Sequence, residues 1–407
     1  MINRRKVLQS LASIPFAGGL FGINSLSAQS RPELLTSNLR RNFFKELGLR
    51  TFINAAGTYT SMTGSLMPKE VIEAISYSAD EYVNLDDLQD KVGERIAELL
   101  ECEYATVSSG CFGAMSIGMA GVITGKDPKK VKQLPNTNGM KNEVIMQESH
   151  SIGYAQALTN VGAKIVKVKT AKQLENAISN KTCMLWFLNA HTDRGEIKWE
   201  EFISLGKKYK IPTFIDCAAD VPPVENLFRF TKMGFDLVAF SGGKGLRGPQ
   251  SAGLLLGKRK YIEAARMHTP PRGETIARGM KVNKEEVLGM LAALELYLEK
   301  DHNKEWEMWE SQIKLISDSA SSIEGVETEI HVPKYANHVP SLRIRWNEKK
   351  VKISPNELSN FEGCFLTGTA AEVTPVSCIA ENQFKVCDTI IDLNESYQAL
   401  VRKKKAA

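Results

Sequence analysis

The sequence predicts an α/β protein with a doubly wound, mostly parallel sheet and a smaller α+β C-terminal domain. Short apolar runs of strand length alternate with helical stretches between Tyr104 and Phe240, which is typical of parallel βαβ units. Small or glycine-rich turns follow several of these runs, at the sheet edge where ligands of such folds bind. After Gly279 the alternation stops, and a long helical stretch begins.

The period of the apolar residues locates the individual elements. Strands are expected at 104–107, 143–146, 165–168, 183–188, 213–215 and 237–240. Helices are expected at 69–83, 87–100, 113–122, 152–161, 171–178 and 199–209. One long helix should run from Asn283 toward Leu315, followed by short strands at 328–332 and 341–346. We therefore expect a large domain over 31–270 and a linker helix with a small domain over 271–407.

The composition is that of a globular protein and argues against binding of nucleic acid or metal. The chain has 407 residues, of which 43% are hydrophobic and 24% charged, enough for one large core and a smaller domain. Its 52 basic residues are nearly balanced by 47 acidic ones and form no stripe, so we expect no nucleic-acid partner. The seven cysteines lack metal-ligand spacing. We expect no metal, and a protein that folds with reduced cysteines.

Residues 1–28 have the layout of an export signal. Arg4 and Arg5 precede an apolar stretch from Leu11 to Leu20, and small residues follow up to Ala28. The adjacent arginines resemble a twin-arginine signal, which exports proteins that have already folded. The protein would then be periplasmic or exported, and cytoplasmic if the signal does not function. An uncleaved anchor or a disordered tail is the alternative, but the apolar stretch is short for a bilayer span.

The turn Ser108–Ala114 lies between an expected strand and an expected helix. Its small residues allow backbone N–H groups to approach an anion, and the helix N-terminus adds a partial positive charge. Ser109, Gly110 and Cys111 are therefore candidate phosphate contacts. Taken alone, the pattern fits an ordinary tight turn better than a phosphate site.

Asp216 ends an apolar strand, and small residues follow it. A carboxylate buried there needs a partner, because an unpaired charge is costly in a medium of low dielectric constant. The protonated pyridine nitrogen of a pyridoxal-phosphate cofactor would be such a partner. Capping of a turn, or pairing with an arginine, is an equally good explanation of this residue alone.

Lys244 lies in a glycine-rich bend directly after the expected strand 237–240. Glycines there cost chain entropy and allow another group to approach closely. An amine held among desolvating neighbours can have its pKa lowered, as Schiff-base chemistry requires. Ser241, at the start of the bend, could donate its hydroxyl to a phosphate oxygen. A solvated surface lysine is the alternative.

At this point the sequence resembles a known group of enzymes. The run 241–251, Ser-Gly-Gly-Lys-Gly-Leu-Arg-Gly-Pro-Gln-Ser, with Asp216 upstream, is similar to fold-type-I pyridoxal-phosphate enzymes. More narrowly, it resembles the group that joins bacterial selenocysteine synthase to D-glucosaminate-6-phosphate ammonia-lyase. Further matches lie at 53–60, 85–89, 92–97 and 278–286, so the resemblance covers about residues 45–300.

The resemblance implies roles for particular residues. Lys244 would bind pyridoxal 5'-phosphate as a Schiff base and move protons, and Asp216 would bind the pyridine nitrogen. His150 would stack on the cofactor ring, although a loop histidine with satisfied hydrogen bonds is the alternative. Arg278 and Lys281 would meet an anionic group of the substrate across the interface of a homodimer or higher homo-oligomer, and a solvated helix start is the alternative for this pair. The phosphate would be held by Ser109, Gly110, Cys111 and Ser241.

The C-terminal stretch departs from this group. Residues 361–402 instead resemble the end of branched-chain aminotransferases, whose Thr-Gly-Thr turn corresponds to 367–369 here. Those enzymes have a different pyridoxal-phosphate fold, and their lysine-bearing part is missing. The turn therefore cannot inherit its phosphate contact, and the domain is atypical after residue 350.

The leading functional interpretation is a lyase that abstracts the α-proton of an amino acid or amino sugar acid and eliminates a β-substituent. Selenium transfer to seryl-tRNA and transamination use the same residues. The non-enzyme alternative is an inactive homologue that binds the cofactor without turnover.

The signal generates a first prediction. We expect a reporter fused after Ala28 to be exported, and the paired substitution Arg4→Lys with Arg5→Lys to retain it in the cytoplasm, because a twin-arginine signal depends on both guanidinium groups. Cell fractionation measures the distribution. Retention of the unmodified fusion in the cytoplasm would contradict export.

Overall fold

The computed structural model describes residues 41–346, except 50, 53, 55 and 56, and parts of the chain between 364 and 391. The chain divides into two units, Met1–Phe52 and Ile53–Ala407. The expected signal at 1–28 lies outside the described residues, as does most of the stretch 361–402. In the first unit a short helix, α2 (Phe43–Glu46), begins after Asn42, whose side chain accepts a hydrogen bond from the Lys45 N–H.

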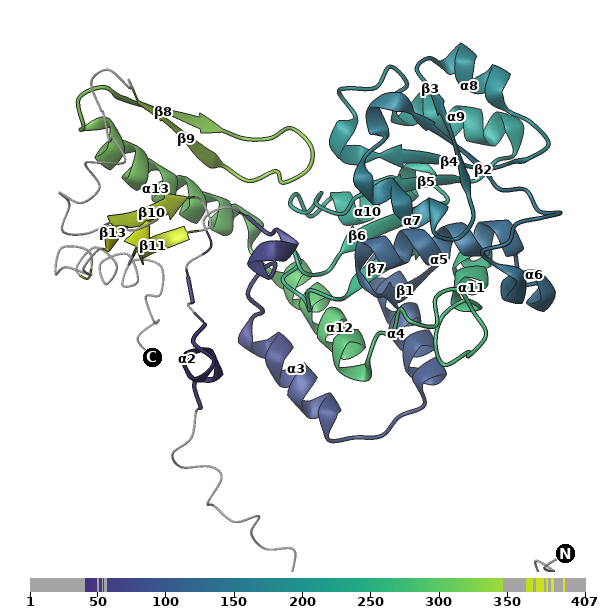
Figure 1. Cartoon of the computed structure of the whole chain (residues 1–407), viewed down its shortest axis with the longest axis horizontal. Coiled ribbons are helices and arrows are strands. Elements are labelled where there is room, and N and C mark those ends of the chain that lie inside the picture. Colours follow the sequence, from purple (N-terminus) through teal and green to yellow (C-terminus); the bar gives the residue numbers. More distant parts are fainter. Residues whose placement is uncertain are drawn as a thin grey trace, which may run out of the picture. The chain divides into compact units, whose positions relative to one another are not determined.

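The second unit contains a seven-stranded sheet with the strand order β1-β7-β6-β5-β4-β2-β3 (Figure 1). Six strands are parallel, and β7 is antiparallel to both β1 and β6. The sheet confirms the predicted α/β fold and its mostly parallel strands. The strands are β1 (Tyr104–Ser108), β2 (Glu143–Gln147), β3 (Lys164–Val168), β4 (Thr182–Leu188), β5 (Thr213–Asp216), β6 (Leu237–Ser241) and β7 (Gly253–Gly257).

The sheet has a hydrophobic core on each of its two faces. Successive strand residues point to opposite sides, so a single strand contributes to both cores. In β6, Val238 and Phe240 join one core cluster while Leu237 and Ala239 join the other. The first face is covered by helices α4, α8, α9, α10 and α12, and the second by α5, α7 and α11. Their bounds are α4 (Leu85–Leu99), α5 (Gly110–Thr124), α7 (Gln156–Thr159), α8 (Ala171–Ala177), α9 (Trp199–Tyr209), α10 (Asn226–Met233), α11 (Arg259–Arg266) and α12 (Lys284–Glu299).

Helix α5 is buried on almost every side because it lies between the sheet and α11. Two glycines make this close packing possible. A Cβ on Gly118 would lie 2.7 Å from the Phe214 ring, and one on Gly121 would lie 2.5 Å from the Ala265 nitrogen. The helix that carries the candidate phosphate turn at its start is thus fixed from both sides.

Helix α12 begins with a capping box, in which Asn283 and Glu286 each bond the other's backbone N–H. It packs against α3 (Lys69–Ala79) and α4, and buries Val287, Met290 and Leu294 in the large core. The boundary expected after residue 270 stays a prediction.

The prediction of a single long helix from Asn283 toward Leu315 is wrong, because two helices cover this range. Helix α12 ends at Glu299, because Lys300 has an extended ψ of 142°. A second helix, α13 (His302–Ser321), then begins with Asp301 as its N-cap. The helical spacing of apolar residues continues from α12 into α13, so the sequence pattern did not show that Asp301 caps a new helix. The helix expected at 152–161 is likewise only a 3₁₀ turn (Gly153–Ala155) followed by α7. Strand β7 was not predicted.

The remaining elements are small. α6 (Pro128–Gln133) follows α5, and β8 (Val326–His331) pairs antiparallel with β9 (Ser341–Trp346) against α13. Two further antiparallel pairs join β10 (Cys364–Gly368) to β11 (Ala371–Val376), and β12 (Cys378–Ile379) to β13 (Asn382–Gln383). Among the described residues, no helix has the length and apolarity needed to cross a membrane.

Candidate active site

The candidate site lies at one edge of the sheet, where β1, β5 and β6 all end. Across the sheet, Ser108 of β1 and Ser241 of β6 both pair with Gly253 of β7, so they lie at the same level. Asp216, the last residue of β5, pairs with Ala239 of the neighbouring β6. The three loops singled out in the sequence therefore leave the sheet from the same edge, as parallel order requires.

The glycine-rich bend around Lys244 is pressed against other backbone. A Cβ on Gly245 would lie 2.0 Å from the Val221 carbonyl oxygen, and one on Gly243 would lie 2.4 Å from the Gln250 Cα. A Cβ on Gly242 would lie 2.5 Å from the Met290 sulfur. The close approach expected at these glycines is thus made by the protein itself. It holds the bend on the loop that follows Asp216.

Asp216 is the buried carboxylate that the sequence predicted, with 2% of its surface exposed. Its Oδ1 accepts a hydrogen bond from the Ala218 N–H at 3.0 Å and faces the Cys111 sulfur at 3.4 Å. Burial raises the pKa of Asp216, while the Ala218 N–H, the Cys111 thiol and the nearby Lys244 amine act in the opposite direction. Among the described residues Asp216 has no ion-pair partner, and a cationic ring nitrogen would supply one.

Lys244 is half-buried and lies in the electrostatic field of acidic groups. Its positive charge opposes the rise in the pKa of Asp216, Asp220 and Cys111. In the part of the chain that the structure describes, the amine has no hydrogen-bond or ion-pair partner. It is therefore available for a bound group.

Ser109 occupies the N-cap position of α5 without a capping hydrogen bond from its side chain, and Gly110 follows with a φ of +68°, which favours glycine. The first N–H groups of a helix point back along its axis and attract anions. Ser241 is half-buried at the end of β6. Ser109, Gly110 and Ser241 therefore lie at the edge of the sheet where the phosphate contacts were predicted.

Cys111 has a different side-chain partner from the predicted phosphate. Its thiol is buried and approaches Asp216, and burial raises its pKa well above the ordinary value, so the sulfur stays protonated. A phosphate contact from this residue would have to come from its backbone N–H in the first turn of α5. A phosphate contact from the Cys111 backbone N–H stays a prediction.

His150 is fully buried in the 3₁₀ turn (Glu148–His150) after β2. Its Nδ1 accepts from the Leu188 N–H at 3.2 Å, and its Nε2 lies 3.2 Å from the His191 carbonyl oxygen. The ring packs edge-on against Phe187, and burial lowers its pKa to about 4, so it is neutral. These contacts match the alternative of a satisfied histidine. Stacking on a cofactor stays a prediction.

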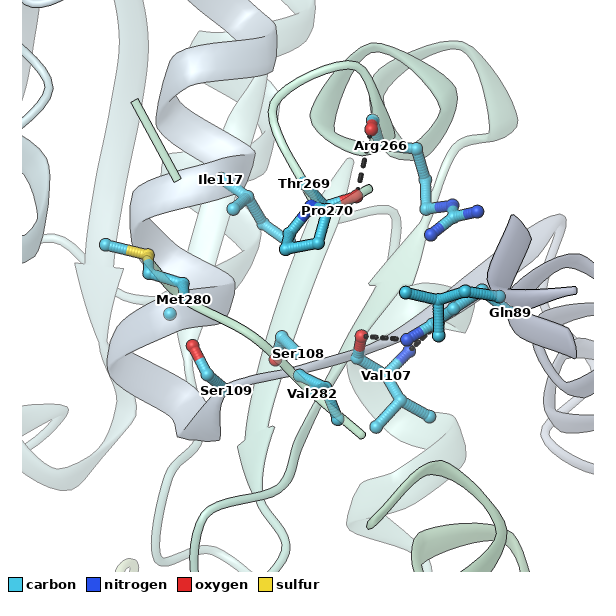
Figure 2. Close-up of a pocket in the computed structure, with 12 residues that line it drawn as sticks. Gln89, Val107, Ser108, Ser109, Ile117, Arg266, Thr269, Pro270, Met280 and Val282 are labelled. Atoms are coloured by element: carbon cyan, nitrogen blue, oxygen red, sulfur yellow. Dashed lines mark hydrogen bonds between the residues drawn. The ribbon is translucent and has the colours of Figure 1, made fainter. Parts of the chain in front are cut away.

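Arg278 and Lys281 lie on the loop before α12, not on its first turn. Arg278 is half-buried and Lys281 is exposed, and neither has an ion-pair partner among the described residues. Between them Met280 lines a cavity, shown in Figure 2, that also reaches Ser109. The cavity is lined by Leu85, Gln89, Val107, Ser108, Ser109, Gly113, Ile117, Arg266, Thr269, Pro270, Met280 and Val282. The predicted substrate residues thus border the cavity without lining it.

The sequence did not single out Arg266, which lines this cavity. Its Nη2 lies 2.9 Å from the Asp86 carboxylate and 3.3 Å from that of Asp90, and its Nε has no partner. Arg272 also pairs with Asp86, at 3.2 Å. These charges balance within the cluster, and no local sequence signal joins residues so far apart.

The sheet order, the Asp216 carboxylate and the unpaired Lys244 amine together define the class of fold-type-I pyridoxal-phosphate enzymes. A family model described as L-seryl-tRNA selenium transferase (SelA) matches residues 52–335, and the chain belongs to this family. Pyridoxal phosphate is the cofactor of this family, as the resemblance implied.

Individual relatives support the same assignment. D-glucosaminate-6-phosphate ammonia lyase of Salmonella typhimurium is 28% identical over 328 residues, covering 78% of this chain and 85% of the lyase. An L-seryl-tRNA(Sec) selenium transferase of Alkaliphilus oremlandii is 27% identical and covers 63% of this chain, which spans 58% of that transferase. A solved structure of D-glucosaminate-6-phosphate ammonia-lyase shares the fold with a TM-score of 0.69 and 24% identity, over 90% of this chain and 99% of that one.

The residues of the site fit pyridoxal phosphate. The amine of Lys244 can bond its carbonyl carbon, Asp216 can pair with its ring nitrogen, and the start of α5 can bind its phosphate. Among the described residues, no group of side chains could hold a metal ion.

The packing of the lysine bend generates a second prediction. Gly245→Ala should lower the free energy of unfolding by about 1–3 kcal/mol, because the added methyl meets the Val221 backbone and cannot be accommodated without a shift. Chemical denaturation measures the change. Gly279→Ala is the matched control, since nothing lies within 4 Å of a Cβ there. Equal stability of the two variants would contradict the packing argument.

Proposed function

We propose that this chain is a pyridoxal-phosphate-dependent lyase that abstracts the α-proton of an amino acid or amino sugar acid and eliminates a β-substituent. The observation that carries the proposal is that the Lys244 amine, which has no partner among the described residues, follows β6 at the same edge of the sheet where the buried Asp216 ends β5. When bound, the cofactor supplies a protonated ring that withdraws electrons from the α-carbon of the substrate.

Each residue of the site has a defined task in this reaction. Lys244 bonds the cofactor in the resting enzyme, and its released Nζ takes the α-proton of the substrate. Asp216 keeps the ring nitrogen protonated, because a buried carboxylate favours a cation beside it. Arg278 and Lys281, at the border of the cavity, bind an anionic group of the substrate.

The choice of a lyase rests on similarity along the chain. The match to the ammonia lyase extends over 85% of that enzyme, whereas the chain spans 58% of the selenium transferase. The near balance of basic and acidic residues also leaves the chain a small net charge of +5 with which to attract a tRNA. A small amino acid or amino sugar acid is therefore the proposed substrate, and D-glucosaminate 6-phosphate is the first compound to assay.

Cofactor attachment through Lys244 gives a third prediction. The purified protein should show the absorption band of lysine-bound pyridoxal phosphate, and Lys244→Ala should lose this band, because the alanine side chain cannot bond the cofactor. Lys172→Ala, which changes an exposed lysine of α8, should keep the band. A band that survives in Lys244→Ala would exclude the proposed role.

The type of reaction gives a fourth prediction. Incubation with D-glucosaminate 6-phosphate or a panel of amino acids should release ammonia and a keto acid without any added keto-acid acceptor. Elimination needs no acceptor, whereas transamination needs one to complete its second half-reaction. Ammonia and keto acid are measured with Lys244→Ala as the blank. Product formation that requires an added acceptor would identify a transaminase instead.

A further inference from the structure

A tight turn follows Asp216 directly, and the shape of this turn determines where the carboxylate points. The Asp220 N–H donates to the Cys217 carbonyl oxygen at 3.2 Å, which closes the turn over four residues. Within the turn, the Ala218 N–H donates to the Asp216 Oδ1 at 3.0 Å. The carbonyl of Ala219 cannot bond inside so short a turn, so any protein group that bonds it must come from another segment.

That group comes from the loop between β8 and β9. The Asn337 N–H donates to the Ala219 carbonyl oxygen at 2.6 Å. Asn337 has a φ of +53°, in the left-handed region that asparagine adopts more readily than most residues. Such a conformation persists where the surrounding contacts hold it. The β8–β9 loop thus has an unfavourable backbone conformation at the residue that bonds the turn after Asp216.

Aromatic rings fix the same loop on both sides of Asn337. Tyr335 packs edge-on against Trp199 of α9, with ring centroids 5.9 Å apart and an interplanar angle of 88°. His338 stacks on Trp306 of α13, with ring centroids 5.5 Å apart. The loop is therefore held to α9 and to α13 at once, which fixes the direction of the N–H group between these two contacts.

Trp199 extends this contact to the strand end beside Asp216. Its indole N–H donates to the Asn189 Oδ1 at 3.0 Å, and Asn189 directly follows β4, which pairs with β5. Asn189 is buried, and its Oδ1 also accepts a hydrogen bond from the Thr192 hydroxyl at 3.1 Å. Through Ala219 and Trp199, the β8–β9 loop therefore holds the segments that follow two neighbouring strands at the site.

We propose that Tyr335 and Asn337 are positioning residues for Asp216. By bonding the Ala219 carbonyl, the β8–β9 loop keeps the turn closed and the Ala218 N–H on the carboxylate. The carboxylate is then ordered before the cofactor binds, so that less freedom is lost on binding. This deepens the proposed function and rests on it, because it takes Asp216 as the partner of the ring nitrogen.

The first experiment measures how often the turn opens in the cofactor-free full chain. Cys217, the first residue of the turn, is fully buried, and Cys183 is buried in β4 at the end away from the site. Tyr335→Ala should raise the rate of iodoacetamide labelling of Cys217 by about two- to tenfold and leave Cys183 unchanged, because the opening is local. Peptide mass spectrometry measures both rates.

Trp346→Ala is the matched control for this experiment. It removes an exposed aromatic ring at the other end of the same hairpin, where Trp346 pairs with Val326. Both cysteines should react in this variant as in the wild type. An equal rise at Cys217 and Cys183 in Tyr335→Ala would indicate general destabilisation and overturn the proposal, as would unchanged rates at both.

The second experiment measures the affinity of the same protein for pyridoxal phosphate by absorption titration. Asn337→Gly keeps the backbone N–H and permits the left-handed φ, so its affinity should equal that of the wild type. Asn337→Pro lacks the N–H and has a φ fixed near about −65°, so its affinity should fall by about two- to tenfold. An unchanged affinity in Asn337→Pro, or an equal loss in Asn337→Gly, would exclude positioning through this N–H.

If Asn337→Pro does not fold, Tyr335→Ala carries the same expected loss of affinity, and Tyr335→Phe, which keeps the ring, should restore it. Failure of the proposed function would appear as an absorption band that survives in Lys244→Ala. Failure of this inference would appear as unchanged affinity in a protein that still binds the cofactor through Lys244. The two failures are therefore distinguishable.

Discussion

The site depends on the contact between two loops, the bend that carries Lys244 and the loop that follows Asp216. Gly245 makes this contact possible, because any side chain there would meet the Val221 carbonyl oxygen. The contact brings an amine toward two carboxylates that lie on a different strand end. Both carboxyl groups are buried, and burial is the largest cause of their raised pKa values. Packing of backbone on backbone thus creates the electrostatics of the site.

The sequence predicted those parts of the molecule whose chemistry is local. Asp216 and Lys244 each follow an apolar strand directly, so residue type and strand position together indicated their roles. The parallel sheet followed from alternating periods, and its order placed the strand ends at one edge. Strand β7 lacked such a signal, because a short apolar run between two glycines, Gly253 and Gly257, does not reveal its antiparallel direction.

The features that the sequence missed depend on contacts between distant segments. Asp220 lies only four residues after Asp216, but its burial arises from packing of loops that no local pattern encodes. Arg266 and Asp86 meet only because α11 and α4 lie beside β1. For Cys111, spacing placed the backbone correctly at the start of α5, while the direction of its thiol followed from the position of Asp216.

Charge balance links these observations to the cofactor. With both thiols neutral, two ionised carboxylates and the Lys244 ammonium would leave one excess negative charge in a buried space. A proton on Asp220 removes this excess when the cofactor is absent. A protonated ring nitrogen beside Asp216 supplies the same positive charge when it is present, so Asp220 can then ionise. The acidity of Asp220 should therefore follow the occupancy of the site.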